Sequence, residues 1–260
     1  MQSLYGSFAV RPAALRSRSS NVAFRRSVSV HAQKPNPILK DQSKVEERDI
    51  IFNPAKESAT DLQKVEQAQT TASSDESLAR VFYAPDAEQA VNEQINHEYT
   101  MSYNYHQMAC YFARDNVALP GLASFFRGHA EEERGHAQQL MDFNSTRGGR
   151  TKLATLAAPE TEYNHPEKGD ALHAMEISLA LEKLNFQYLY RLHKVADDSG
   201  DAQFADFVES MLADQANGVK EVADFVTQLR RVGKGLGVYE WDKDIMDRGS
   251  AQLAQVSGTA

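Results

Sequence analysis

Four long segments of this chain each carry one apolar stripe, and no other feature of the sequence constrains the fold as much. In residues 91–112, 122–143, 172–193 and 204–229, stripe positions recur at alternating spacings of three and four. This is the spacing of one face of an α-helix that packs against its neighbours. Because four such faces can bury one another in a bundle, the sequence predicts an all-α four-helix bundle.

The segments between the stripes predict how the helices are connected. RDNVALPG separates the first two helices and DDSGD the last two, and both are short turns. The link between the second and third helices is far longer, and it opens with Gly148 and Gly149, which stop a helix. We therefore expect two short-loop hairpins, one long crossover and, after the glycine-rich break at Gly233, a short fifth, C-terminal helix.

Polar side chains interrupt each stripe near its middle. An unpaired carboxylate inside a bundle costs several kcal/mol, and three of them would offset most of the stability of a typical domain. No Lys or Arg lies on the stripes, so we expect a bound cation instead. Carboxylates with one imidazole form a site that suits iron or manganese. The interrupting residues are Glu98, Glu133, His136, Glu182 and Gln215.

The Glu-x-x-His spacing is not specific on its own, because it occurs twice. Glu133 and His136 share one face of a helix, whereas Glu162 and His165 precede Pro166 in the expected crossover, where solvated surface is the simpler interpretation. A lone core Glu or His usually hydrogen-bonds a neighbour and binds no metal. What favours a dinuclear metal site is the occurrence of Glu133 and His136 together with the mid-stripe carboxylates of the other helices.

The fourth helix departs from a symmetric dinuclear site. Such a site repeats Glu-x-x-His there, but this chain has Gln215 followed by Gly218. The second metal position is therefore expected to bind more weakly than the first. A site that oxidises iron and releases the product can work with one strong and one weak position.

The first 33 residues differ in composition from the rest of the chain. They hold five arginines and seven serines and no acidic residue, which is typical of an organelle transit peptide; a basic arm that binds nucleic acid is the alternative. Without these arginines the formal net charge changes from −8 to −13, which disfavours nucleic acid as a partner and suits cations. No apolar run is long enough to cross a membrane, so no membrane partner is expected.

Residues 34–80 are polar and read as an extension rather than a second domain, with a possible short helix near residues 55–67. The bundle domain is expected over residues 81–250, followed by a tail at 251–260. The single cysteine, Cys110, excludes an intrachain disulfide, and we expect it to be a small buried side chain of the first bundle helix.

Several motifs over residues 80–240 resemble those of ferritins, specifically the plastid ferritins of plants and algae. The motifs are INHEYTMSYNYHQMACYFARDNVAL, EEERGHAQQLMDFNSTRGGR, GDALHAMEISLALEKL, ADFVES and QLRRVGKGLGV. The extension resembles the peptide that precedes the first helix in plastid ferritins, which favours the chloroplast stroma over the mitochondrion. The resemblance implies a ferritin-like bundle and a shell of 24 subunits, of this chain alone or with other ferritin subunits, that oxidises Fe(II) to Fe(III) with dioxygen and stores ferric mineral.

The same resemblance assigns roles to individual residues. It makes Glu98, Glu133, His136 and Glu182 iron ligands of a ferroxidase site and gives Gln215 to the weaker position. It places Tyr105 beside the metals and Glu132 near the weaker one, although an exposed helix glutamate is an equal interpretation of Glu132. His193, Asp206 and Glu209 would line an iron-entry channel, although the two acids also fit a solvated face. Gly135 and Gln138 replace glutamates usual in heavy-chain types, which disfavours efficient mineral nucleation.

Three other functions remain as alternatives. A di-iron oxygenase or desaturase would need a second Glu-x-x-His, and Gln215 with Gly218 argues against it. A non-enzymatic storage-shell subunit would not need the intact ligands. A metal-free structural bundle would leave three buried carboxylates without compensation.

Overall fold

In the computed structural model of the chain, residues 58–70 and 77–257 are described. The predicted transit peptide, residues 1–33, and most of the predicted extension lie outside these residues. Within the extension, helix α2 spans Ala59–Thr70, close to the short helix expected near residues 55–67.

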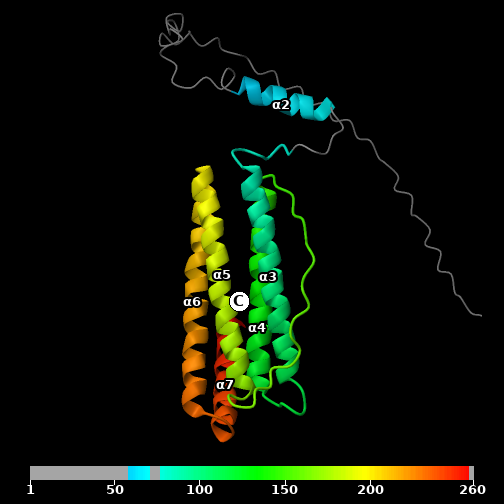
Figure 1. The fold of residues 1–260 in the computed structure, drawn as a ribbon. Helices are drawn as coiled ribbons and strands as arrows, with labels where there is room; N and C mark the ends of the chain where they lie inside the picture. The colour runs from blue at the N-terminus through cyan, green and yellow to red at the C-terminus, as the bar shows by residue number, and fades with distance from the viewer. Residues whose placement is uncertain (1–57, 71–76, 258–260) are drawn as a thin grey trace, which may run out of the picture. The chain divides into compact units, whose positions relative to one another are not determined.

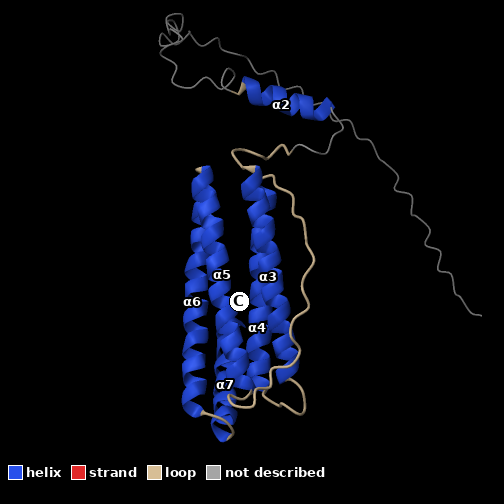
Figure 2. Cartoon of the chain, viewed as in Figure 1, coloured by secondary structure: helices blue, strands red, loops and turns tan. Residues whose placement is uncertain are grey.

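Four long helices form the bundle, and the predicted fold is confirmed (Figure 1). They are α3, Pro85–Phe112; α4, Pro120–Thr146; α5, Asp170–Ser199; and α6, Ala202–Val232. Helices α3 and α4 form one hairpin, α5 and α6 form the other, and residues 147–169 are the long crossover between them. Among the described residues, all the helices are α-helices and the connections are loops and turns (Figure 2).

The fifth helix of the predicted fold, α7, spans Leu236–Ser257 and packs against the beginning of α4. The buried carboxylate of Asp242 accepts hydrogen bonds from the backbone N–H groups of Gly121 (2.9 Å) and Leu122 (2.7 Å). A side-chain carboxylate is a favoured partner for these N–H groups, which have no acceptor within their own helix. A Cβ at position 121 would overlap the Asp242 carbonyl oxygen, so glycine is required there.

The turn between α5 and α6 follows directly from its sequence. Gly200 ends α5 in the left-handed conformation (φ 66°), which glycine adopts without a steric penalty. Asp201 then begins α6, because its side chain accepts a hydrogen bond from the Phe204 N–H at 3.0 Å. This local chemistry makes the short antiparallel connection that the sequence predicts.

The apolar core of the bundle consists of two clusters with a polar layer between them. The first cluster includes Phe112, Phe126, Met175 and Leu229, together with Trp241 of α7. The second cluster lies toward the other end of the bundle. Its members include Val91, Ile95, Leu140, Leu189, Phe204 and Val208. Each stripe therefore contributes to both clusters and, between them, to the polar layer.

One expectation about the first bundle helix is wrong. Cys110 is exposed, not buried, because its position on α3 turns away from the stripe that includes Ala109 and Phe112. Among the described residues, no helix has both the length and the apolar character needed to cross a bilayer.

Candidate metal centre

The polar layer brings together one or two side chains from each of the four bundle helices. Glu98 comes from α3, Glu133 and His136 from α4, Glu182 from α5 and Gln215 from α6. The three carboxylates are 0 to 3% exposed, a degree of burial that carboxylates seldom show without a compensating partner. Thus all five polar residues predicted from the stripes meet in one place.

Three of these side chains form a compact set of candidate metal ligands. One ligand atom each of Glu98, Glu133 and His136 lies within 4.8 Å of the other two. Nδ1 of His136 is 3.0 Å from Oε2 of Glu133, as expected for residues one helical turn apart. Two carboxylates and an imidazole, from two helices, can therefore hold a divalent cation of the iron or manganese class.

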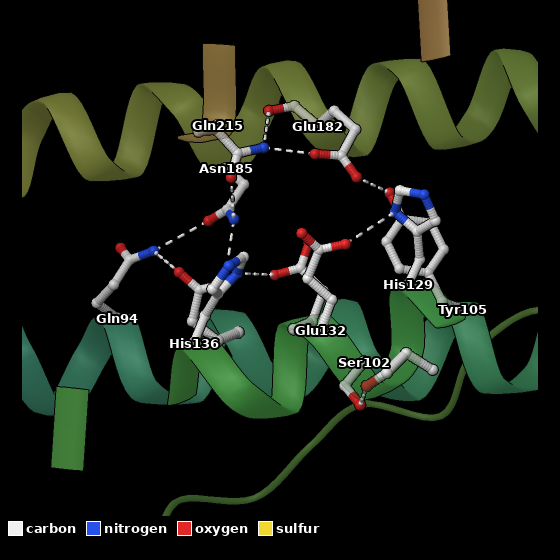
Figure 3. A network of polar contacts seen from close by, with 12 residues as sticks. Gln94, Ser102, Tyr105, His129, Glu132, His136, Glu182, Asn185 and Gln215 are labelled. Atoms are coloured by element: carbon white, nitrogen blue, oxygen red, sulfur yellow. Dashed lines mark hydrogen bonds and ion pairs between the residues drawn. The ribbon is translucent and has the colours of Figure 1, made fainter. Parts of the chain in front are cut away.

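Glu182 occupies the other side of the layer, where neutral groups hold it. The buried hydroxyl of Tyr105 donates to Oε1 of Glu182, and Nε2 of Gln215 donates to Oε2 (Figure 3). Ser178 donates in turn to the Tyr105 oxygen at 3.2 Å. Both carboxylate oxygens of Glu182 thus have a donor, and the side chain has one fixed position in the layer.

A small cavity of about 20 Å³ opens among these side chains, which is enough for one water molecule or one ion. Gly218 contributes to its wall, and a Cβ there would lie 3.5 Å from Oε2 of Glu182, so a larger side chain would fill this space. The lining also includes residues that the sequence analysis did not single out, His129 and Asp214. The cavity is lined by His129, Glu132, Glu133, His136, Glu182, Asp214, Gln215 and Gly218.

Burial changes the acidity of the groups in the layer. Desolvation raises the pKa of Glu133 to about 8 and that of Glu98 well above its usual range, and the neighbouring Glu133 charge raises the Glu98 pKa further. Desolvation likewise raises the pKa values of Glu182 and of Tyr105. It lowers the pKa of His129, so this imidazole is favoured in its neutral form. A bound cation would reverse the effect on the carboxylates, because it stabilises their ionised form.

Glu132 points differently from Glu133. Its side chain is exposed, although it lines the cavity, and its Oε2 lies 3.9 Å from Nδ1 of His129 (Figure 3). It is therefore both a surface glutamate and a neighbour of the polar layer, so the two interpretations of its position are compatible.

The three residues expected at an entry channel lie outside the polar layer. Nε2 of His193 is 3.1 Å from Oε1 of Glu209, and its Nδ1 is 3.3 Å from Oδ2 of Asp197. Asp206 is an exposed residue of α6, one helical turn before Glu209. A single subunit thus brings His193 and Glu209 together on the surface. Their role as a channel stays a prediction.

The second Glu-x-x-His lies in the crossover, as expected. Glu162 is exposed and forms an ion pair with Arg114 at 2.8 Å. Nδ1 of His165 accepts hydrogen bonds from the backbone N–H groups of Glu167 and Lys168. The two side chains have separate partners, and the spacing by itself creates no site.

Two buried amides complete the polar layer, and sequence reasoning missed both. Gln94 and Asn185 are nearly inaccessible to solvent, and each donates a hydrogen bond to a carboxylate oxygen of Glu98. Gln94 is one turn before Glu98, and Asn185 is three residues after Glu182. These spacings from the predicted ligands are the signal in the sequence that could have identified them.

Comparison with known proteins agrees with this architecture. The Ferritin-like domain of the Ferritin family matches residues 88–232. Ferritin-1, chloroplastic, of Nicotiana tabacum is 50% identical over 78% of this chain and 79% of its own length. Ferritin-3, chloroplastic, of Arabidopsis thaliana is 48% identical over 76% of this chain and 74% of its own length. A crystal structure of ferritin from the multicellular green alga Ulva pertusa is 52% identical, with a TM-score of 0.72 over 76% of this chain and 100% of that chain.

The buried carboxylate layer and these matches define the class as an iron-binding, ferritin-like helical bundle. The chain belongs to the ferritin family, and its function is iron storage. Its matched relatives are chloroplast proteins, and the chain is a chloroplast protein as well, in agreement with the localisation predicted from the resemblance of its extension to that of plastid ferritins.

Proposed function

We propose that the chain oxidises Fe(II) to Fe(III) with dioxygen at a di-iron centre in the polar layer. The first iron position is formed by Glu98, Glu133 and His136. The second is formed by Glu182 and Gln215, with Tyr105 and Glu132 beside it. The observation that carries this proposal is that ligand atoms of the buried Glu98 and Glu133 and of the partly buried His136 lie within 4.8 Å of one another, next to a cavity that reaches Glu182 and Gln215.

The burial of the ligands supports iron as the substrate of this site. Without a cation, the raised pKa values of Glu98 and Glu133 favour protonated carboxyls, which are poor ligands. Binding of Fe(II) displaces these protons, because the ionised carboxylates then have a compensating charge. Each Fe(II) gives up one electron to dioxygen, and the redox chemistry belongs to the metals and not to a side chain.

The second position is the weaker one, and this suits storage. Gln215 supplies a neutral amide oxygen, and Gly218 supplies no ligand where an imidazole would complete a symmetric site. Ferric product bound there has fewer charged ligands and leaves more readily toward the mineral. The lack of a second Glu-x-x-His on α6 is also the feature that separates this centre from that of a di-iron oxygenase.

The remaining proposals concern the assembly. The chain forms a shell of 24 subunits, alone or with other ferritin subunits, and ferric mineral collects in the cavity of that shell. Fe(II) enters through channels to which His193, Asp206 and Glu209 contribute, since rings of carboxylates select cations. The single-chain geometry that supports this is the close pair of His193 and Glu209 on the surface.

Rapid mixing of anaerobically loaded protein with oxygen tests the proposed centre. The wild type should oxidise two Fe(II) per subunit in a fast phase. The Glu133→Ala/His136→Ala variant should lose that phase, with a rate at least about 100-fold lower, because it lacks two of the proposed ligands. The matched control is Glu162→Ala/His165→Ala, which removes the same residue types at the same spacing from the crossover and should oxidise iron as the wild type does.

Equal and slow oxidation by the wild type and the Glu133→Ala/His136→Ala variant would refute the proposed centre. The chain would then be a storage-shell subunit without catalytic activity. Loss of the fast phase in the control variant, with the Glu133→Ala/His136→Ala variant unaffected, would instead show that the crossover, and not the polar layer, carries the reaction.

A further inference from the structure

Asn185 is the most buried amide of the polar layer that has no role in the proposed iron centre. It is 1% exposed and lies on α5, three residues after Glu182. Residues three apart share a helix face, so Asn185 points into the same layer as the proposed ligand. A buried amide needs partners for its two hydrogens and for its oxygen, and those partners show what it does.

The side chain of Asn185 connects the two proposed iron positions. Its Nδ2 donates to Oε2 of Glu98 and to Oε1 of Gln215, both at 3.1 Å. Figure 3 shows Asn185 beside Gln215. Its Oδ1 accepts a hydrogen bond from Nε2 of Gln94 at 2.9 Å, and the same Gln94 nitrogen donates to Oε1 of Glu98 at 2.7 Å. One amide therefore binds a residue of the first position and a residue of the second.

The orientation of the Gln215 amide is determined by the carboxylate that accepts its hydrogen bond. Nε2 of Gln215 donates to Oε2 of Glu182, and a rotated amide would place its oxygen against that carboxylate instead. The oxygen of Gln215 therefore faces the N–H of Asn185. Since the oxygen is the only atom of a glutamine side chain that ligates iron, Asn185 holds the part of Gln215 that matters for binding.

We propose that Asn185 is a positioning residue of the iron centre, whose amide links Glu98 to Gln215 and so couples the first iron position to the second. This inference rests on the proposed di-iron centre. The two ends of this link differ in the hydrogen bonds that remain without Asn185. Glu98 keeps the hydrogen bond from Gln94 when Asn185 is removed, whereas the Gln215 oxygen loses the donor that Asn185 supplies. The second position should therefore weaken more than the first.

Anaerobic titration with Co(II), followed by its visible absorption, tests this link in the assembled protein. The wild type should bind two Co(II) per subunit in two steps. Asn185→Leu keeps a side chain of similar volume without the amide, and Asn185→Ala serves as a second variant should leucine fit the layer poorly. In both variants the affinity of the second step should fall about three- to tenfold, the effect of losing one hydrogen bond, and that of the first step should fall less.

Steady-state Fe(II) oxidation adds a readout that a general loss of packing would not reproduce. The Fe(II) concentration at half-maximal rate should rise by a similar factor in the Asn185 variants, while the maximal rate changes less. The matched control is Asn144→Leu. Asn144 is equally buried (0% exposed), but it hydrogen-bonds Tyr83 and Thr151 outside the polar layer. That variant should lose stability and keep both Co(II) steps.

The outcomes separate the inference from the proposed function. Two wild-type steps that stay unchanged in both Asn185 variants would overturn the positioning role and leave the di-iron centre intact. An equal weakening of the second step in Asn144→Leu would also overturn it, because the effect would then be one of general packing. A wild-type titration without a tight step would overturn the iron centre itself, and the inference with it.

Discussion

The chain contains the pattern Glu-x-x-His twice, and the two copies have different surroundings. Glu133 and His136 lie on one face of α4, with the carboxylate buried and the imidazole nitrogen 3.0 Å from it. Glu162 and His165 lie in the crossover, where the first pairs with Arg114 and the second accepts backbone N–H groups. The spacing therefore acquires chemical meaning only where a helix directs both side chains toward other buried carboxylates.

The copy of Glu-x-x-His in the crossover contains a buried residue, Tyr163, and the removal of its side chain should have the largest effect on stability. Tyr163 is 1% exposed, packs edge-on against Tyr111 and donates from its hydroxyl to the Glu160 carbonyl oxygen at 2.7 Å. Tyr163→Ala should lower the free energy of unfolding by about 3–5 kcal/mol, as for other large buried side chains. Guanidinium unfolding of the metal-free protein measures this. A loss comparable to that of Glu162→Ala would show that the tyrosine does not anchor the crossover.

The two glutamates should differ sharply in metal binding. Glu133→Gln removes a charged ligand but keeps the shape of the side chain, and Glu162→Gln makes the same change on the surface. The first should weaken anaerobic Fe(II) binding at least about 100-fold, which is about 2.7 kcal/mol, since even a change of a residue behind a ligand costs 10- to 100-fold. The second should leave the affinity unchanged. Similar affinities for both variants in equilibrium dialysis would remove the distinction between the two copies.

The pH dependence of stability should distinguish Glu133 from Glu162 as well. The pKa of Glu133 is raised from 4.5 to about 8, so the folded metal-free protein binds this proton more tightly than the unfolded chain does. The stability from this group is therefore fully present below pH 4.5 and is lost as the pH rises through about 8. Between pH 6 and pH 8 the metal-free bundle should lose up to about 2 kcal/mol through this carboxyl.

Thermal unfolding of chelator-treated protein at several pH values checks this sign. Glu133→Gln should reduce the drop, and the raised pKa values of Glu98 and Glu182 should preserve part of it. Glu162→Gln should show the full drop of the wild type. A metal-free protein that becomes more stable from pH 6 to pH 8 would contradict the assignment of buried, protonated carboxyls.

The sequence was sufficient for the parts of the molecule that depend on periodicity. The stripes located the bundle helices, and the interruptions of those stripes identified Glu98, Glu133, His136, Glu182 and Gln215, because an ionisable residue on an apolar face is visible in one dimension. Comparison with the surrounding stripe also separated Glu162 and His165 from the polar layer. These predictions needed only the rule that residues three or four apart share a face.

The rest of the fold and of the candidate site depends on how the helices are rotated about their axes and paired with one another. Asn185 and Gln94 do not stand out in the sequence as interruptions of a stripe. The packing of α3 against α5 nevertheless brings Nε2 of Gln94 to 2.9 Å from Oδ1 of Asn185. The contact of Asp242 with the start of α4 likewise follows from packing between segments distant in sequence, whereas the exposed position of Cys110 follows from the periodicity of its own helix. Spacing along one helix does not determine which neighbour a side chain meets across the bundle.

The smallest effect should come from the ion pair of the crossover copy. Arg114 donates to both Glu162 oxygens, at 2.8 and 2.9 Å, and to the Thr161 carbonyl oxygen at 3.0 Å, but both side chains are partly or largely exposed. Solvent screens such a pair, so Arg114→Ala should cost at most about 1 kcal/mol and leave iron oxidation unchanged. A double-mutant cycle with Glu162→Ala isolates the coupling energy. A coupling energy above about 2 kcal/mol would mean that the Arg114–Glu162 ion pair is as strong as a buried one. The contrast in burial would then no longer explain why only Glu133 and His136 form a site.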